Sequence, residues 1–343
     1  MNNLPQFSVV SPHALLAPNV SVGAFSVIHE GVTIGEGTII ESNVTLYPGV
    51  VIGKNCHIFP GTVISAHVNK IEKQNNCLEN QVIIGDYVEI EPNVSINGNI
   101  RIGNHVWIGS SAGIHHGARI GNFCKIFSGA IISSIPQDLK FKGEESILSI
   151  GDRTIVREYA TLNRGTAANK ATIIGTDCLI MAYVHIAHDC IIGDHVILVN
   201  GVNMAGHVEV GDYAVISGLS AIHQFVRIGK HAMISGGSML GKDVPPYITA
   251  GRSPVQYEGL NSIGLKRCHF DYNQTNLMRN AYRILFCEGL NFSNALKQIE
   301  ENIADCPEKD EIMLFLTDSH ASRGIIKGNV EMAEVVINGH AKG

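Results

Sequence analysis

The sequence predicts an all-β solenoid built from short parallel strands, followed by a small α-helical domain. Branched aliphatic residues recur at every sixth position over most of the chain. Gly is frequent, with 36 of 343 residues, whereas aromatic residues make up only 6%. A period of six fits neither an amphipathic helix, which repeats near 3.6, nor an isolated strand, which repeats near 2. Small and branched residues in one fixed frame are typical of a thin core that repeats along the chain.

The repeat runs in two frames. The first frame extends from Leu16 to Ile64, and the second begins at Ile84, is interrupted twice and ends at Leu240. We expect one strand per hexad, three hexads per triangular coil and one inward aliphatic side chain on each side, worth about 1.5–3 kcal/mol of burial. Hexapeptide solenoids coil left-handed, so the expected fold is a left-handed parallel β-helix. Gly often follows the aliphatic residue, which suits a tight turn with an unusual φ.

Breaks in the frame divide the chain into parts. We expect extra N-terminal coils at 1–66, a connecting loop at 67–81, the main coil at 82–250, a helical domain at 251–330 and a loose tail at 331–343. The main coil is interrupted by polar loops, at 133–149 and at 163–172, and such loops usually carry binding groups.

The end of the main coil is marked by Asp243-Val244-Pro245-Pro246-Tyr247. Neither proline can donate a hydrogen bond to a strand ladder, so this segment is expected to stop the coil. From about Tyr257 the apolar spacing becomes helical.

Composition excludes several classes of protein. A net charge of −6 argues against a general nucleic-acid binder, and no apolar run approaches the length of a membrane span. The first ten residues lack a basic residue and do not resemble a signal peptide. Eight cysteines without framework spacing fit a reducing cytoplasm, so we expect a cytoplasmic protein. Four of them fall in the small inward slot of the repeat and are expected to pack in the core: Cys56, Cys124, Cys178 and Cys190.

The strongest candidate site is the run His185-Ile186-Ala187-His188-Asp189-Cys190. Residues three hexads apart lie above one another in adjacent coils. His188, Gly206 and Gln224 therefore form one column, which spans about 10 Å by the strand spacing. Such a column is a polar seam suited to a sugar-sized ligand. A lone histidine at a corner of such a coil is most often simply exposed to solvent. Alternatively, His185 and His188 are spaced so that both could bind one metal ion. Because Cys190 is expected to point into the core, it cannot serve as a third ligand, and we expect no metal site.

Several motifs lie in order along the chain: QDLKFKGE at 137–144, GDR at 151–153 with ATLNRGT at 160–166, HIAHDC at 185–190, MAGHV at 204–208, IHQF at 222–225 and DVPPY at 243–247. With these motifs the chain resembles the UDP-N-acetylglucosamine O-acyltransferases, the trimeric bacterial enzymes that begin lipid A synthesis. The resemblance covers roughly Ile84 to Lys327. Residues 1–66 lie outside it, and an elongated scaffold or, alternatively, a docking surface would account for them.

The resemblance implies roles for individual residues. His188 matches the general base, which takes the proton from the sugar 3-hydroxyl as that oxygen attacks an acyl thioester; such a base is worth about 10²–10⁴ in rate. Asp189 would orient the imidazole. The backbone N–H of Gly206 would face the developing oxyanion and increase the rate by a factor of about 10²–10³. In the family each cleft lies between two subunits, so these groups need not come from one chain.

The resemblance also implies a substrate-binding set. The expected members are Gln137, Asp138, Lys140, His185, His207, His223, Gln224, Asn261 and Arg267. Gly236 is expected to leave the acyl groove open for a long 3-hydroxyacyl chain, whereas Met239 is a change that shortens it, so the chain length stays open. Ile263 stands where the family has a carboxylate, and Cys268 stands where it has an arginine. Which residues contact the nucleotide is therefore left open as well.

The sequence thus predicts a homotrimeric O-acyltransferase that moves a 3-hydroxyacyl chain from acyl carrier protein to UDP-N-acetylglucosamine in lipid A biosynthesis. No cofactor is expected beyond the phosphopantetheine arm of the carrier. A sugar N-acyltransferase of the same superfamily and a non-catalytic binding solenoid are the alternatives. Basic groups expected to receive the acidic carrier are Lys140, Lys142, Arg153, Arg157 and Arg227.

Overall fold

The computed structural model describes residues 7–65, 81–318 and 322–328. The chain divides into two compact units, Met1–Asp194 and His195–Gly343, and each is described by itself. The tail expected at 331–343 and all but the last residue of the connecting loop expected at 67–81 lie outside the described residues. No helix within the described ranges has both the length and the apolar character needed to cross a lipid bilayer.

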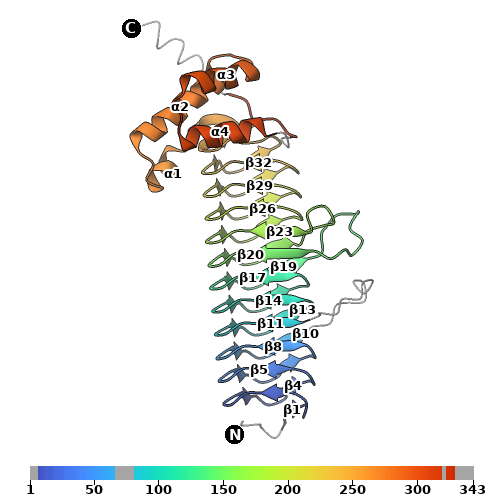
Figure 1. The fold of residues 1–343 in the computed structure, drawn as a ribbon. Helices are drawn as coiled ribbons and strands as arrows, with labels where there is room; N and C mark the ends of the chain where they lie inside the picture. Colours follow the sequence, from blue (N-terminus) through green and yellow to red (C-terminus); the bar gives the residue numbers. More distant parts are fainter. Residues whose placement is uncertain (1–6, 66–80, 319–321, 329–343) are drawn as a thin grey trace. The chain divides into compact units, whose positions relative to one another are not determined.

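The first unit is a coil of short parallel strands on three sides (Figure 1). One side holds β1 (Val9–Val10), β4 (Val27–Ile28), β7 (Thr45–Leu46), β10 (Val63–Ser65), β13 (Ser95–Asn97), β16 (Gly113–Ile114), β19 (Ile131–Ser134), β22 (Thr161–Asn163) and β25 (His185–Ile186). The second holds β2 (Leu15–Leu16), β5 (Thr33–Ile34), β8 (Val50–Ile52), β11 (Val82–Ile84), β14 (Ile100–Ile102), β17 (Ala118–Ile120), β20 (Ile147–Ile150), β23 (Ala171–Ile174) and β26 (Ile191–Ile192). The third holds β3 (Ser21–Val22), β6 (Ile39–Ile40), β9 (His57–Ile58), β12 (Glu89–Ile90), β15 (Trp107–Ile108), β18 (Lys125–Ile126), β21 (Ile155–Val156) and β24 (Leu179–Ile180).

Each strand therefore pairs with the strand three places later in the chain. This is the arrangement of a left-handed parallel β-helix, and it confirms the predicted fold class. The register follows the aliphatic frame: Ile34 pairs with Ile52, Ile52 with Ile84, and Ile84 with Ile102. All four side chains are buried. The aliphatic frame shifts between β10 and β11, but the register of the strands is kept. The column of inward-facing aliphatic side chains therefore continues without a break across this shift.

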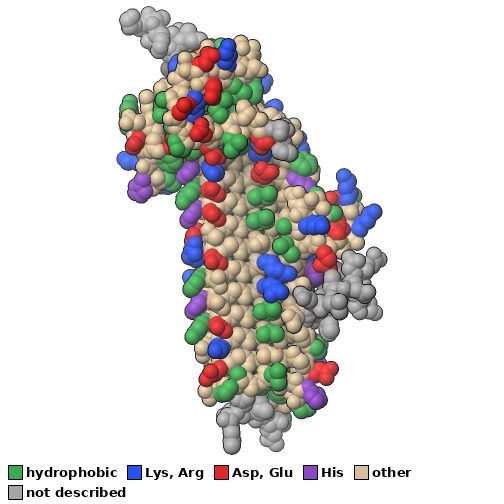
Figure 2. Space-filling view, viewed as in Figure 1, with side chains coloured by type: hydrophobic (Ala, Val, Ile, Leu, Met, Phe, Trp, Pro, Cys, Tyr) green, Lys and Arg blue, Asp and Glu red, His purple; other side chains and the backbone are tan. Residues whose placement is uncertain are grey.

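The same register produces stripes of like side chains on the outer surface. Val51 pairs with Ile83, and Arg101 pairs with Arg119, so similar side chains stand above one another on successive rungs. Figure 2 shows these stripes as lines of hydrophobic and of charged groups that run along the coil.

The glycines that follow the aliphatic residues serve a different purpose from the one the sequence indicated. Gly35 and Gly53 do not have positive φ; the left-handed conformation is instead adopted at non-glycine corner residues such as Asn19, Asn43 and Asn55. A Cβ built on Gly35 would lie 2.5 Å from the carbonyl carbon and oxygen of Gly53 on the next rung. These glycines are therefore needed for the close approach of stacked backbones, not for an unusual φ.

We expect Gly35→Ala to lower the free energy of unfolding by about 1–3 kcal/mol, the usual cost of overpacking. Its methyl group would meet fixed backbone on the next rung rather than a flexible side chain. Urea unfolding measures the change. Gly241→Ala is the control, because a Cβ there meets nothing within 4 Å. An equal effect of both substitutions would contradict the close-approach explanation.

The second unit contains a coil of the same type and several helices. Its strands are β27 (Ile197–Leu198), β28 (Asn203–Met204), β29 (Glu209–Val210), β30 (Val215–Ile216), β31 (Ala221–Ile222), β32 (Arg227–Ile228), β33 (Met233–Ile234), β34 (Met239–Leu240), β35 (Ile248–Gly251) and β36 (Gln256–Leu260). Its helices are α1 (Ser262–Arg267), α2 (Tyr272–Cys287), α3 (Phe292–Asn302) and α4 (Pro307–Thr317). The helical domain expected after the coil is confirmed.

Two details of the coil end differ from the sequence prediction. The prolines do not stop the coil, because β35 still pairs in parallel with β33 after them. The stop comes one turn later, where β36 pairs antiparallel with β35. Tyr257 therefore lies in a strand, and helical structure begins only at Ser262. The hydroxyl of Tyr282 on α2 donates to the carbonyl of Pro246 at 2.6 Å, which fastens the helices to this end of the coil.

Candidate active site

His188 and Asp189 lie at the corner between β25 and β26, near the end of the first unit. Asp189 has φ +60°, the left-handed conformation found at other corners of the coil. This conformation turns its carboxylate toward the neighbouring imidazole, and Oδ2 of Asp189 lies 2.8 Å from Nδ1 of His188. The two residues are only 8% and 1% exposed. The corner thus holds an imidazole and a carboxylate in contact, largely shielded from water.

The loop at 163–172 holds the Asp189 carboxylate from the other side. The backbone N–H of Thr166 donates to Oδ1 at 2.9 Å, and its hydroxyl donates to Oδ2 at 2.6 Å. The backbone N–H of Asn169 adds a longer contact to Oδ1 at 3.3 Å. In turn, the backbone N–H of Asp189 donates to the hydroxyl of Thr172 at 2.8 Å. These donors favour the ionised carboxylate, which accepts only, so Nδ1 of His188 carries the ring proton and Nε2 carries the lone pair.

His185 faces a neighbouring rung rather than the carboxylate. Its Nδ1 lies 2.8 Å from the hydroxyl of Thr161, its partner in the ladder between β22 and β25. Burial lowers the pKa of the His185 imidazole, since the charged form is poorly solvated there. A neutral imidazole at this point is suited to hydrogen bonding with an uncharged polar ligand, as the prediction for a sugar contact requires.

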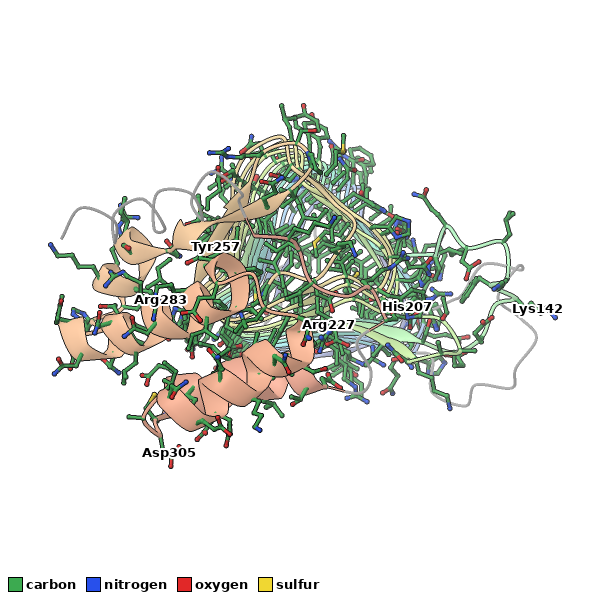
Figure 3. All side chains as sticks on the ribbon, turned by 90° about the horizontal axis from the view of Figure 1, so that it is seen from above. Lys142, His207, Arg227, Tyr257, Arg283 and Asp305 are labelled. Atoms are coloured by element: carbon green, nitrogen blue, oxygen red, sulfur yellow. The ribbon has the colours of Figure 1, made fainter. Side chains whose placement is uncertain are left out.

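The loop between β19 and β20 carries Gln137, Asp138 and Lys140. Gln137 and Lys140 are exposed and Asp138 is half-buried. Oδ1 of Asp138 accepts from the backbone N–H of Lys140 at 2.9 Å, which closes a tight turn. Figure 3 shows the neighbouring Lys142 on the part of this loop that projects from the coil.

In the second unit, Gly206 and His207 lie at the corner between β28 and β29. The His207 ring stacks on Phe225 with centroids 4.7 Å apart, and the Gly206 carbonyl accepts from the backbone N–H of Phe225. His223 is exposed, with its Nδ1 3.2 Å from the carbonyl of Gln224. That same carbonyl accepts from Nε of Arg323 at 2.8 Å. His188 and Gly206 belong to different units, so their alignment in one column stays a prediction.

An apolar cavity of about 300 Å³ lies between β31 and β34 of the second unit. Its lining residues are Ala221, Ile222, His223, Met239, Leu240 and Gly241. Met239 is 75% exposed and contributes its side chain to this cavity. Gly236 is not among the lining residues; a Cβ there would make ordinary contact with the carbonyl oxygen of Gly218 at 3.4 Å. Of the two residues expected to set acyl length, Met239 is therefore the one that borders the cavity.

The amide of Asn261 is used by the fold itself. Its Oδ1 caps α1 by accepting from Gly264, and its Nδ2 donates to the carbonyl of His231 at 2.9 Å. Arg267 is exposed at the end of α1, and Ile263 is exposed near its start. Contact of Asn261 and Arg267 with a nucleotide stays a prediction, although Asn261 evidently also positions the helix that carries Arg267.

The cations expected to receive an acidic partner are not equally available. Arg227 is only 8% exposed, and its guanidinium binds the carboxylates of Asp243 and Asp318 at 3.0 and 2.7 Å. It also lies over the Phe315 ring of α4, and Figure 3 shows Arg227 beside that helix. Arg227 is therefore a structural residue, and its proposed role as a docking cation is wrong.

The remaining cations lie in the first unit. Arg153 pairs with Asp177 at 2.6 Å and Arg157 pairs with Glu158 at 2.9 Å, so both charges are already partly neutralised. Lys140 and Lys142 are exposed on the loop between β19 and β20.

The four cysteines expected in the core are all buried. Burial raises the pKa of the Cys124 thiol to about 11, and it raises that of Cys56 as well. Cys190 lies directly after Asp189, but it packs inward with the aliphatic residues and belongs to the core.

Thr166, Asn169 and Thr172 were missed as members of the site. Thr166 lies in one of the quoted motifs, but nothing in the repeat connects it to Asp189, because the loop at 163–172 stands outside the hexad frame. For Thr166 and Asn169 the only signal was the position of a polar loop shortly before the HIAHDC motif. Thr172 lies in β23, and the register of β23 with β26 places it opposite Cys190, so its nearness to Asp189 follows from the frame.

A coil of hexapeptide repeats, with a buried imidazole–carboxylate pair at one corner and a small helical domain, is typical of the hexapeptide-repeat transferases. Models of hexapeptide repeats match residues 13–48, 31–66, 99–134 and 171–206. A model described as UDP-N-acetylglucosamine O-acyltransferase, domain 2, matches residues 243–326.

Individual relatives narrow this class. The acyl-[acyl-carrier-protein]–UDP-N-acetylglucosamine O-acyltransferase of Chlorobaculum tepidum is 58% identical over 207 residues, covering 60% of this chain and 78% of its own. The protein of the same name from Thermodesulfovibrio yellowstonii is 43% identical over 251 residues, covering 73% of this chain and 94% of its own. The crystal structure of a UDP-N-acetylglucosamine acyltransferase from Bacteroides fragilis superimposes with a TM-score of 0.70 at 43% identity, covering 79% of this chain and 98% of that one. The chain belongs to the UDP-N-acetylglucosamine O-acyltransferase family.

Proposed function

We propose that this protein transfers a 3-hydroxyacyl chain from acyl carrier protein to the 3-hydroxyl of UDP-N-acetylglucosamine, the first step of lipid A biosynthesis. The observation that carries the proposal is the His188–Asp189 pair in a chain of this family. The contact of 2.8 Å and the burial of both residues fix the imidazole with its lone pair on Nε2. A fixed neutral imidazole is what a general base for hydroxyl attack requires.

The reaction then proceeds with a balanced transfer of one proton. Nε2 of His188 takes the proton of the sugar hydroxyl as its oxygen attacks the thioester carbonyl. The tetrahedral intermediate places negative charge on the carbonyl oxygen, which the backbone N–H of Gly206 stabilises. The carbon–sulfur bond breaks, the imidazolium returns its proton to the leaving thiolate, and the carrier leaves with a free thiol. Asp189 stays ionised throughout and stabilises the transient imidazolium.

The substrates and the assembly belong to the same proposal. The nucleotide sugar binds through the loop residues Gln137, Asp138 and Lys140 together with His185 and the second-unit residues named above. The acidic carrier approaches the exposed Lys140 and Lys142. The active protein is a homotrimer in the cytoplasm with clefts between subunits. The carrier's phosphopantetheine arm is the only prosthetic group involved, and no metal takes part.

Mass spectrometry of the product tests this function. Purified protein is incubated with 3-hydroxyacyl carrier protein and either UDP-N-acetylglucosamine or its 3-amino analogue. We expect an ester product from the hydroxyl acceptor. A product from the amino sugar alone would instead support the N-acyltransferase alternative. Absence of turnover with either acceptor, together with retained binding of a partner protein, would support a non-catalytic solenoid.

The cavity beside Met239 leads to a prediction about acyl-chain preference. Met239→Ala removes the exposed thioether that borders the cavity and is expected to shift preference toward longer acyl chains. Each methylene accommodated in such a slot changes specificity by about 1–3 kcal/mol. The ratio of kcat/KM for two carrier-bound chains that differ by two methylenes measures this shift. The exposed Leu219→Ala serves as the control, and an unchanged ratio in Met239→Ala would show that Met239 does not limit the chain.

A further inference from the structure

We propose that the His116–Glu145 pair is a tether that holds the loop between β19 and β20 in its substrate-binding position. The inference rests on the proposed function, because the loop carries Gln137, Asp138 and Lys140. His116 and Glu145 would be positioning residues that act through this loop.

The His116 imidazole is buried and its proton position is fixed by two contacts. Its Nδ1 lies 3.3 Å from the backbone N–H of Asn99, which can only donate, so Nδ1 is the acceptor. The ring proton is therefore on Nε2, which donates to Oε2 of Glu145 at 3.1 Å. The coil thus presents one defined donor, and the end of the loop supplies the acceptor.

The backbone of His116 holds the other end of the same loop. Its carbonyl accepts from the hydroxyl of Ser133 at 2.7 Å, directly where β19 passes into the loop. One residue of the coil therefore binds the end of β19, just before the loop, through its carbonyl, and it binds Glu145 near the end of the loop through its ring. Figure 1 shows this loop beside the one between β22 and β23, both projecting from the coil.

Arg164 connects this anchor to the middle of the loop. Arg164 is 2% exposed, and its guanidinium donates to the His116 carbonyl at 3.3 Å and lies 5.5 Å from the ring centre of Phe141. The backbone N–H of Phe141 donates to the carbonyl of Asp138 at 3.0 Å. A chain of contacts thus runs from His116 through Arg164 and Phe141 to the turn that presents Asp138.

Glycines make room for the tether. A Cβ on Gly98, one rung away, would lie 2.6 Å from Cα of His116. Gly117 has φ +83° and a Cβ there would collide with the carbonyl oxygen of Ser146. The backbone next to His116 is therefore shaped for close approach by both the neighbouring rung and the loop end.

Glu145→Ala tests the tether with little risk to folding, because the Glu145 side chain is 48% exposed. We expect KM for UDP-N-acetylglucosamine to rise about three- to tenfold, with kcat within about twofold of wild type, since one partly exposed charged hydrogen bond is lost. Hydrogen exchange of the backbone amides of residues 137–144, measured without substrate, should become faster. Glu41→Ala is the matched control, because Glu41 pairs with His57 at 2.8 Å elsewhere on the coil.

Two substitutions of His116 separate its contacts. In His116→Gln the amide nitrogen stands in for Nε2 and keeps the link to Glu145. In His116→Asn the amide oxygen stands in for Nδ1 and keeps the contact with Asn99, but the side chain is too short for Glu145. We expect the Asn variant to behave like Glu145→Ala and the Gln variant to remain close to wild type.

The outcomes distinguish this inference from the proposed function. Wild-type protein without turnover would overturn the proposed function. Wild-type turnover with unchanged KM for the sugar nucleotide in Glu145→Ala would overturn the tether, whether or not hydrogen exchange changed. A fall in kcat as large as the rise in KM would overturn it too, because that pattern indicates a general structural defect.

Discussion

His188→Ala is expected to reduce kcat/KM for acyl transfer by about 10²–10⁴, the usual contribution of a general base. Nε2 of His188 is the group that takes the hydroxyl proton in the proposed reaction, and water cannot be held in its place with the same geometry. The loss should appear mainly in kcat, because a general base acts in the proton-transfer step and not in the binding of the substrates. Initial rates of carrier thiol release at saturating substrate measure it.

The chain offers a closely matched control for this experiment. His57 also lies on the coil and contacts a carboxylate, Glu41, at 2.8 Å. His57→Ala removes the same group from the same type of rung and should leave kcat unchanged. Equal rates in His188→Ala and wild type, with both proteins folded, would contradict the assigned base.

Asp189→Asn is expected to lower kcat by about 10²–10⁴ as well, through the wrong tautomer of His188. The carboxylate accepts from Nδ1 of His188 and from the hydroxyl of Thr166 through Oδ2, and from backbone N–H groups through Oδ1. In the asparagine variant, an NH₂ group takes the place of one of these two oxygens. Because the backbone N–H of Thr166 cannot reverse its role, the NH₂ group turns toward His188, whose Nδ1 then has to accept. The ring proton moves to Nε2, where it blocks the uptake of the hydroxyl proton.

The same substitution should also lower the free energy of unfolding. Asp189 is 1% exposed, so a donor that loses its acceptor here costs about 1–3 kcal/mol. Urea unfolding measures this cost, and Glu41→Gln is the control at an exposed pair. A variant that retained most of its kcat while losing stability would show that Asp189 supports the fold without orienting the base.

The fold could be predicted from the sequence because a hexad period leaves one solution for the backbone. The inward column from Ile34 through Ile52, Ile84 and Ile102 follows directly from that period. The role of Gly35 was misjudged, because the period shows where a residue lies and not what lies 2.5 Å away on the next rung. The prolines at the coil end were misjudged for a related reason: β35 pairs beyond them, where no ladder donor is required of either proline.

The candidate site could be predicted only in part. The pairing of His188 with Asp189 follows from adjacency in sequence, and the corner position follows from the frame. The support of Asp189 by Thr166, the contact of His116 with Glu145 and the burial of Arg227 against Asp318 do not. Each of these joins the regular coil to a loop or helix of irregular length, so no repeat arithmetic specifies which residues meet.

The central claim is that a neutral His188, held by Asp189, accepts the proton of the acceptor hydroxyl. The most direct test is the rate of carrier thiol release in His188→Ala, measured with and without added imidazole. The variant should lose most of the wild-type rate, and imidazole should restore part of it, because the added ring supplies the lone pair that the variant lacks. A variant that kept the wild-type rate, with or without imidazole, would contradict the claim.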